Sequence, residues 1–169
     1  MAIEHSVPDE HLRHIGDITV SFALLETNVQ FFVGSLIAEH QRIGQIITAE
    51  LPFRTVRSLV ISLYLERHGE DDDFHTLKEL MKRACHVEKE RNRIAHSIWG
   101  AGENRDTLTR IKTTAKERQG LSFQYESVTT DMLREIATEI RQVANDVLSF
   151  QVSLMDKGKA INNPFQKLW

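Results

Sequence analysis

Three long segments of the chain carry apolar residues at alternating spacings of three and four. This spacing places the apolar side chains along one face of an α-helix, which is then buried against other helices. The first stripe is Ile15, Ile18, Phe22, Leu25, Val29, Phe32 and Leu36. The second is Leu77, Leu80, Ala84, Val87, Arg91, Ile94 and Ile98, and the third is Leu133, Ile136, Ile140, Val143, Val147, Phe150 and Leu154. The three stripes predict an all-α fold, organised as an antiparallel four-helix-type bundle.

The segment between the first and second stripes supplies the remaining helices. Pro52 breaks it into a short extra helix near 41–50 and a longer helix near 53–67. Gly69 ends the longer helix. The acidic residues at 71–73 then provide an N-cap and favourable first-turn charge for the next helix.

A change of pattern after Gly100 predicts a small β-hairpin, inserted before the last helix. Leu121, Phe123 and Tyr125 alternate with polar residues, which is the period of a strand. The preceding run is rich in threonine, and the two runs together span about 107–128. Thr129 or Thr130 is expected to cap the last helix.

The length of 169 residues favours one domain with an ordinary hydrophobic core. We expect a helical domain over 1–158 and a C-terminal tail over 159–169 that lies outside the bundle. Hydrophobic residues make up 41% and charged residues 27%, which is a globular balance and excludes a disordered chain. The net charge of -3 excludes a globally basic surface, but it leaves room for a local basic site.

Three observations favour a cytoplasmic protein with no membrane segment. The single cysteine, Cys85, excludes an intramolecular disulfide and fits a reducing compartment. The first fourteen residues carry charges where a secretion signal needs an apolar run. The uninterrupted apolar stretches, such as 58–65, are too short to cross a bilayer.

Arg91 interrupts the second stripe, at a position where its heptad neighbours are valine and isoleucine. Burial of a guanidinium costs several kcal/mol unless the group is paired and hydrogen-bonded. Glu88, one turn earlier, and Glu26, beside the first stripe, are the candidate ion-pair partners. Solvent in a cleft or a ligand anion are the other ways to compensate the charge.

Asn92 and His96 are four residues apart, so they share one face of this helix. Arg91 and His96 are about 140° apart around an ideal helix, which favours positions on two sides of a cleft. Gly100 implies that His96 falls in the last turn, where the helix dipole favours an imidazolium. An arginine and a proton-carrying histidine together are suited to binding a phosphate.

The segment 91–96, "RNRIAH", resembles the Arg-x(4–6)-His motif of the HEPN superfamily (higher eukaryotes and prokaryotes nucleotide-binding), including the asparagine that often follows the arginine. The resemblance implies a metal-independent endoribonuclease with no cofactor, in which two protomers form the active site between them. Arg91, Asn92 and His96 would then be the catalytic residues. His96 would act as base or acid, Arg91 would bind the scissile phosphate of the RNA substrate, and Asn92 would orient the phosphate or ribose.

The resemblance further implies a homodimer, products with 2',3'-cyclic phosphate ends, and a toxin or defence effector. Its partner would be an antitoxin of the nucleotidyltransferase type.

Five basic residues near the motif and on the hairpin are candidates for steering the RNA backbone. They are Arg93, Arg110, Lys112, Lys116 and Arg118. A solvated strand face is the default explanation of the hairpin cations, and the steering role depends on the ribonuclease hypothesis. The histidines show no metal-ligand spacing with a third ligand, so we expect no metal.

A second hypothesis belongs to another class of protein. In it the chain is a non-catalytic dimeric helical bundle that binds nucleotide or a protein partner, and Arg91 forms a structural ion pair. His96 would then be a helix-end histidine bonded to a carbonyl. A purely structural interaction domain is the third alternative.

Overall fold

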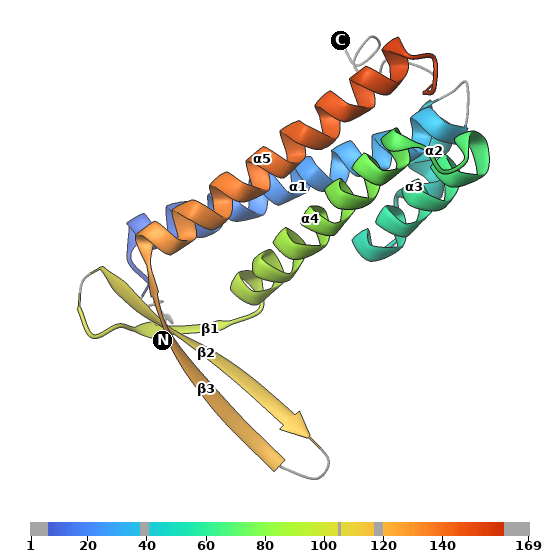
Figure 1. Ribbon diagram of the computed structural model, residues 1–169. Helices are drawn as coiled ribbons and strands as arrows, with labels where there is room; N and C mark the ends of the chain where they lie inside the picture. Colours follow the sequence, from blue (N-terminus) through green and yellow to red (C-terminus); the bar gives the residue numbers. More distant parts are fainter. Residues whose placement is uncertain (1–6, 38–40, 105, 117–119, 161–169) are drawn as a thin grey trace.

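The computed structural model describes residues 7–37, 41–104, 106–116 and 120–160 (Figure 1). The described part of the chain is mostly helical and also contains a small three-stranded antiparallel sheet. The helices are α1 (Asp9–Ile37), α2 (Gln41–Thr48), α3 (Phe53–His68), α4 (Asp72–Ala95) and α5 (Thr130–Asp156). The predicted helical class is therefore confirmed, as are the break at Pro52 and the stop at Gly69.

The three apolar stripes form a common core. Ile18, Leu25, Leu77 and Leu133 are completely buried, and α3 adds Val60 to the same cluster. Phe22 of α1 packs edge-on against Phe53 at the start of α3, with ring centroids 5.1 Å apart. The periodicity of the sequence thus identifies the buried faces of α1, α4 and α5.

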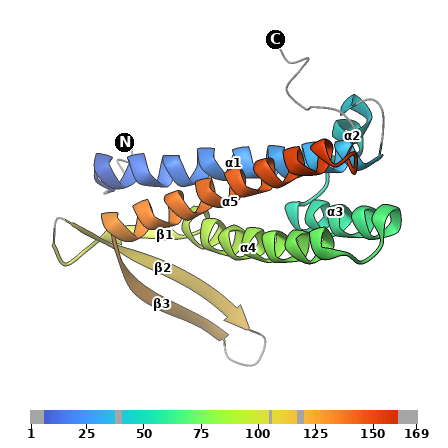
Figure 2. The ribbon, with the colours of Figure 1, turned by 45° about the horizontal axis from the view of Figure 1, so that its top comes forward.

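The prediction of an antiparallel arrangement is wrong for α1 and α5, which lie side by side and run in the same direction (Figures 1 and 2). Their contacts follow in the same order along both helices, from Asp17–Arg141 at one end to Phe32–Phe150 at the other. The physical reason is the short helix α2, which turns the chain back before α3 begins. Because the chain reverses at α2, α3 runs in the same direction as α1; α4 then runs back, and α5 runs in the direction of α1 again.

A close backbone approach fixes α2 against α1. A Cβ atom added at Gly44 of α2 would lie 2.3 Å from the Cα of Gly34 in α1. Any side chain at position 44 would collide with the backbone of α1, so glycine at this position allows the two helices to come this near. The outward side of α2 carries Ile43, Ile46 and Ile47, which remain partly or largely exposed.

Asp71 caps α4 and also ties the end of the chain to the bundle. Its Oδ1 accepts a hydrogen bond of 2.8 Å from the backbone N–H of Phe74, as predicted for the acidic run. Lys159 Nζ donates to Asp71 and Asp73 over 2.7 and 2.6 Å. The bond from Lys159, followed by that from Phe74, lowers the pKa of Asp71 to about 2.

The predicted boundary of the tail therefore needs correction. Lys159 contacts α4, and Ala160 is buried in the core, so the bundle extends past residue 158. The physical reason is this ion cluster, whose acidic members lie far away in the sequence. Residues 161–169 of the predicted tail lie outside the described residues.

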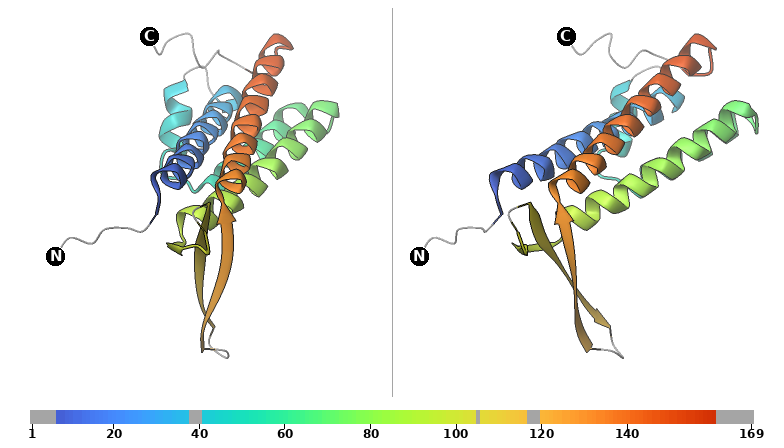
Figure 3. Two further views of the ribbon diagram at one scale, coloured as in Figure 1. Left: turned by 90° about the vertical axis from the view of Figure 1, so that its left-hand side faces the viewer. Right: turned by 60° about the vertical axis from the view of Figure 1, so that its left-hand side comes forward.

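The strands are β1 (Ile98–Ala101), β2 (Thr107–Lys116) and β3 (Gly120–Thr129), in the order β1-β2-β3. The hairpin predicted over about 107–128 is confirmed by β2 and β3, whereas β1 was not predicted. Leu108 and Val128 are buried where the sheet meets the helices. Farther out, β2 and β3 form a ribbon that projects away from the helices (Figures 1 and 3).

Helix α1 meets the length and composition of a membrane-crossing helix, a property that the short uninterrupted apolar runs of the sequence did not reveal. Its most apolar eighteen-residue window is 61% buried inside the protein. A core helix of a soluble bundle passes the same test, because it is apolar around most of its circumference.

The Gly34–Gly44 contact leads to a stability prediction with an internal control. We expect Gly44→Ala to lower the free energy of unfolding by about 1–3 kcal/mol, because the new methyl group forces α2 away from α1. At Gly16, on the open side of α1, an added Cβ atom would have no neighbour within 4 Å. Gly16→Ala should therefore raise the free energy of unfolding by about 0.5–1 kcal/mol. Urea titration of both variants checks the pair, and equal shifts of one sign would contradict the close contact.

Candidate functional site

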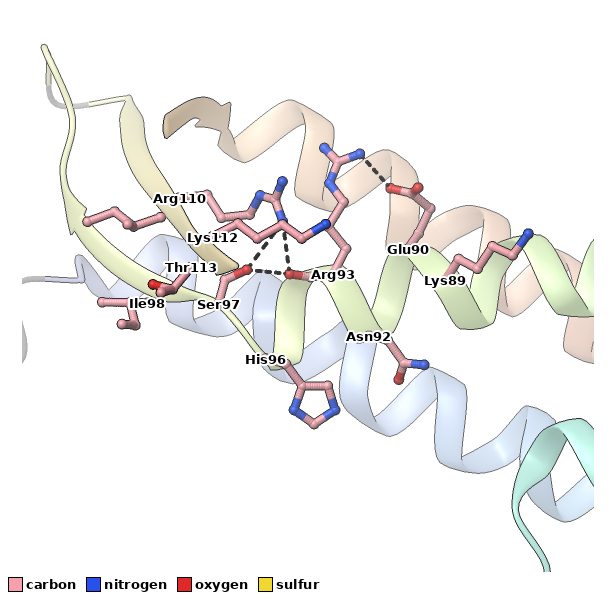
Figure 4. Close-up of a pocket in the computed structure, with 11 residues that line it drawn as sticks. Lys89, Glu90, Asn92, Arg93, His96, Ser97, Ile98, Arg110, Lys112 and Thr113 are labelled. Carbon is pink, nitrogen blue, oxygen red and sulfur yellow. Dashed lines mark hydrogen bonds and ion pairs between the residues drawn. The ribbon is translucent and has the colours of Figure 1, made fainter. Parts of the chain in front are cut away.

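A pocket of about 590 Å³ lies in the angle between the last turns of α4 and the edge of β2 (Figure 4). Helix α4 contributes Lys89, Asn92 and Arg93, and His96 follows directly after its end. The strands contribute Ile98, Arg110, Ile111, Lys112 and Thr113. Two of the three predicted catalytic residues, Asn92 and His96, therefore lie at this pocket.

The end of α4 is set by hydrogen bonding and by strand pairing. The helix stops at Ala95, and His96 occupies the C-cap with a non-helical backbone. Ser97 Oγ donates to the carbonyl of Arg93, and Ile98 then enters β1 opposite Ile111. The expectation that the helix runs on to Gly100, with Ile98 in its apolar stripe, is therefore wrong. Ile98 is 62% exposed on the sheet.

Asn92 and His96 project to the same side of α4, away from Arg93 and Glu90 (Figure 4). Asn92 is half-buried and His96 is exposed. The four-residue spacing accounts for the shared direction, even though His96 is one residue past the helix. An exposed imidazole beside an amide can exchange a proton with, and hydrogen-bond to, a ligand in the pocket.

Arg91 does not line this pocket. Its guanidinium carbon lies 4.0 Å from the ring centroid of Phe22, and its Nη2 lies 3.6 Å from Glu26 Oε1. The side chain is 23% exposed. Helix α4 presents Arg91 to α1 because a five-residue offset from His96 turns it well around the helix. The expectation that Arg91 and His96 flank one cleft is not met within this chain.

The two carboxylates proposed as partners of Arg91 have separate roles. Glu26 contacts Arg91, and burial raises the pKa of Glu26 in spite of the opposing effect of that guanidinium. Glu88 instead pairs with Arg57 of α3 over 3.0 Å. The physical reason is the position of α3, which lies against the side of α4 that carries Glu88.

An ion cluster joins the sheet to α4 beneath the pocket. Arg110 of β2 donates to Glu126 of β3 through both Nε, at 2.9 Å, and Nη2. The other oxygen of Glu126 accepts from Arg93, which also contacts Glu90 over 3.2 Å. Arg110 Nη1 further donates to the Arg93 carbonyl and to Ser97 Oγ (Figure 4).

Arg110 is only 8% exposed, and its hydrogen bonds give it a structural role. It is therefore neither a solvated side chain on the strand nor free to steer RNA. The sequence contained a signal for its partner, because pairing of the predicted hairpin places residue 126 opposite residue 110. Nothing in the sequence indicated a role for Ser97, because its hydrogen bonds to Arg93 and Arg110 depend on where α4 ends.

The other three hairpin cations differ in where they lie and in how much of them the structure describes. Lys112 is exposed and lines the pocket. Lys116 is the last residue of β2, and its side chain lies outside what the structure describes. Arg118 falls outside the described residues altogether.

The charge at the pocket is opposite in sign to that of the whole protein. Its described lining includes four permanent cations, Lys89, Arg93, Arg110 and Lys112, and one carboxylate, Glu90. Glu126 behind the lining adds a second carboxylate, so the balance is four minus two, or +2, against -3 for the chain. Lys89 and Lys112 have no ion-pair partner among the described side chains. An anionic ligand is the chemistry that this arrangement favours.

Within the described ranges, no group of three or more histidine, cysteine, aspartate or glutamate side chains is placed to hold a metal ion. In comparisons with family models, curated proteins and solved structures, none matched this chain.

The ion cluster leads to a second stability prediction. Glu126→Gln should lower the free energy of unfolding by about 2 kcal/mol, between the values for buried and exposed pairs, because it leaves Arg110 and Arg93 without their shared charge partner. The control is Glu79→Gln, which breaks the well-exposed Glu79–Lys82 pair of α4 and should cost less than about 0.5 kcal/mol. Guanidinium titrations measure both values. Equal losses would show that Glu126 does not hold the sheet to α4.

Proposed function

We propose that this protein is a metal-independent endoribonuclease of the HEPN type, with a HEPN-like four-helix bundle and an active site shared between two protomers. The observation that carries the proposal is the position of Asn92 and His96, which project to the same side of α4 and line a pocket of net positive charge on an otherwise acidic protein. The resemblance of residues 91–96 to the Arg-x(4–6)-His motif supplies the reaction class.

The chemistry follows from what RNA cleavage without a metal requires. The ribose 2'-OH attacks the adjacent phosphorus, the bond to the 5'-oxygen breaks, and a 2',3'-cyclic phosphate forms. A base must remove the 2'-proton and an acid must protonate the leaving oxygen. His96 of one chain supplies one of these groups, so a symmetric dimer with two motifs supplies both. Asn92 would orient the phosphate or ribose.

The proposed phosphate contact of Arg91 depends on release of its present partner. Its Nη2 lies 3.6 Å from Glu26, which is longer than a direct hydrogen bond. A phosphate is a stronger partner for a guanidinium, because it accepts two parallel hydrogen bonds. Lys89 and Lys112 add positive charge from the pocket side.

As a toxin or defence effector in the cytoplasm, the protein would be held inactive by a partner, for which a nucleotidyltransferase-type antitoxin is the candidate that the family resemblance implies. A partner that covers the pocket would block His96 directly.

The first test of the proposal is cleavage of RNA by purified protein in the presence of EDTA. We expect cyclic-phosphate ends, and we expect His96→Ala to lower the rate by about 100-fold or more. The melting temperature should hardly change, because the His96 side chain is exposed. His86→Ala, at an exposed histidine of α4, is the matched control and should cleave normally. Cleavage that persists in His96→Ala, or that stops in EDTA, would refute the assignment.

A second candidate function is a non-catalytic dimeric bundle that binds nucleotide or a protein partner. The observation that favours it is the engagement of Arg91 with Glu26 and with the ring of Phe22. In that arrangement the arginine holds α1 and α4 together, and the motif is structural.

Arg91→Ala separates the two candidates when it is compared with Arg57→Ala. Arg57 resembles Arg91 in that it pairs with a glutamate and lies over a phenylalanine ring, 5.5 Å from the ring centroid against 4.0 Å for Arg91, but it lies outside the motif. We expect both variants to lose about 1–2 kcal/mol of unfolding free energy. Only Arg91→Ala should also lose RNA cleavage, by about 100-fold or more. If the wild-type protein leaves RNA intact and Arg91→Ala unfolds, the second candidate is the correct one.

A further inference from the structure

One face of the sheet is uncovered and apolar. Strand alternation and register place Ile98, Ile111, Thr113, Phe123 and Tyr125 on this face, which we call the outer sheet face. The other face carries Leu108 and Val128, which the helices bury. On the outer sheet face, Phe123 is 51% exposed, Tyr125 is 68% exposed and Ile98 is 62% exposed. Exposed aromatic rings add little to the folding free energy, so their presence on this face is better explained by binding of a ligand.

The outer sheet face is continuous with the pocket. Ile98, Ile111 and Thr113 belong to both, because they also line the pocket. Tyr125 stands opposite Ile111, and Phe123 stands opposite Thr113, so the two rings are the next side chains across the sheet. The pairing of β1 covers β2 only from Leu108 to Ile111. Beyond that point the edge of β2 borders the pocket, and a ligand can pass over it.

We propose that the outer sheet face is a stacking platform for single-stranded RNA that leads into the pocket, with one base on Tyr125 and the next on Phe123. The inference rests on the proposed ribonuclease function and names its substrate class. Two residues apart on a strand, the rings stand about 7 Å from each other. That spacing fits an extended strand with splayed bases. Stacked bases of a duplex, about 3.4 Å apart, do not match it.

The charges around this surface favour a nucleic acid over a second protein. Lys112 lines the pocket from the face of β2 that also carries Arg110, opposite the outer sheet face, and Lys89 lines the pocket from α4. Neither has an ion-pair partner in the described part of the chain, so both are available to phosphates. Aromatic rings beside unpaired cations are the combination that binds single strands with little regard to sequence. A nucleic acid brings phosphates to these lysines, whereas an apolar protein surface laid on the rings does not.

The test uses the full-length protein and a labelled oligonucleotide of about ten nucleotides with 2'-O-methyl riboses. This probe lacks the nucleophile, so binding is measured without cleavage. Fluorescence anisotropy should show that the single strand binds more tightly than a duplex of the same sequence. We expect Phe123→Leu and Tyr125→Leu each to weaken binding by about tenfold, because leucine keeps the face apolar but removes the ring. Gln124→Ala, on the opposite face of β3, is the control and should bind as the wild type does.

Three outcomes would overturn the platform. Leucine variants that bind the single strand normally would show that the rings do not stack on bases. Equal affinity for the duplex would remove the single-strand assignment. A change from dimer to monomer in the Phe123→Ala and Tyr125→Ala double variant, measured by sedimentation without RNA, would assign the face to a second copy of the chain.

The same measurements keep this inference separate from the ribonuclease proposal. Ring-dependent binding of the probe without cleavage of ordinary RNA would refute the nuclease and retain the platform. Cleavage that is unaffected by the leucine variants, together with normal binding, would refute the platform and retain the nuclease.

Discussion

The carboxylate of Glu126, shared between Arg93 and Arg110, is the contact on which the rest of the site depends. It joins β3, β2 and α4 at one point, just where the sheet leaves the helical core. The pocket exists because this joint holds the edge of β2 at an angle to the end of α4. The cost of placing a nearly buried guanidinium there is offset by its bonds to Glu126, Ser97 and a helix-terminal carbonyl.

Local signals in the sequence predicted most of the helical structure. Apolar periodicity marked the buried faces of α1, α4 and α5, because a stripe that regular has to be covered. Pro52, Gly69 and Asp71 act through their own backbone and side-chain chemistry, so their effects can be recognised without knowledge of the fold. The same holds for Asn92 and His96, whose common direction follows from a four-residue spacing.

What the sequence left open depends on contacts between distant segments. The sequence shows that Arg91 interrupts the apolar stripe, but it does not show which glutamate pairs with Arg91. That choice depends on the position of α3, because Arg57 of α3 pairs with Glu88 and leaves Glu26 to Arg91. The sequence pattern predicts the end of a helix where β1 lies, because these residues form a strand only by pairing with β2. The parallel course of α1 and α5 likewise follows from the turn made by α2. By contrast, the register of the hairpin is sufficient to place Glu126 opposite Arg110.

The connections of the sheet to the helices are unusually short. Two residues separate the end of α4 from β1, and β3 passes into α5 with no intervening residue. Thr129 ends the strand and also caps the helix, accepting a hydrogen bond from the backbone N–H of Met132. No loop is available at that junction to absorb a rotation. The ribbon and α5 therefore behave as the two arms of a lever, and a force applied to the projecting strands is delivered to the packing of α5 against α1.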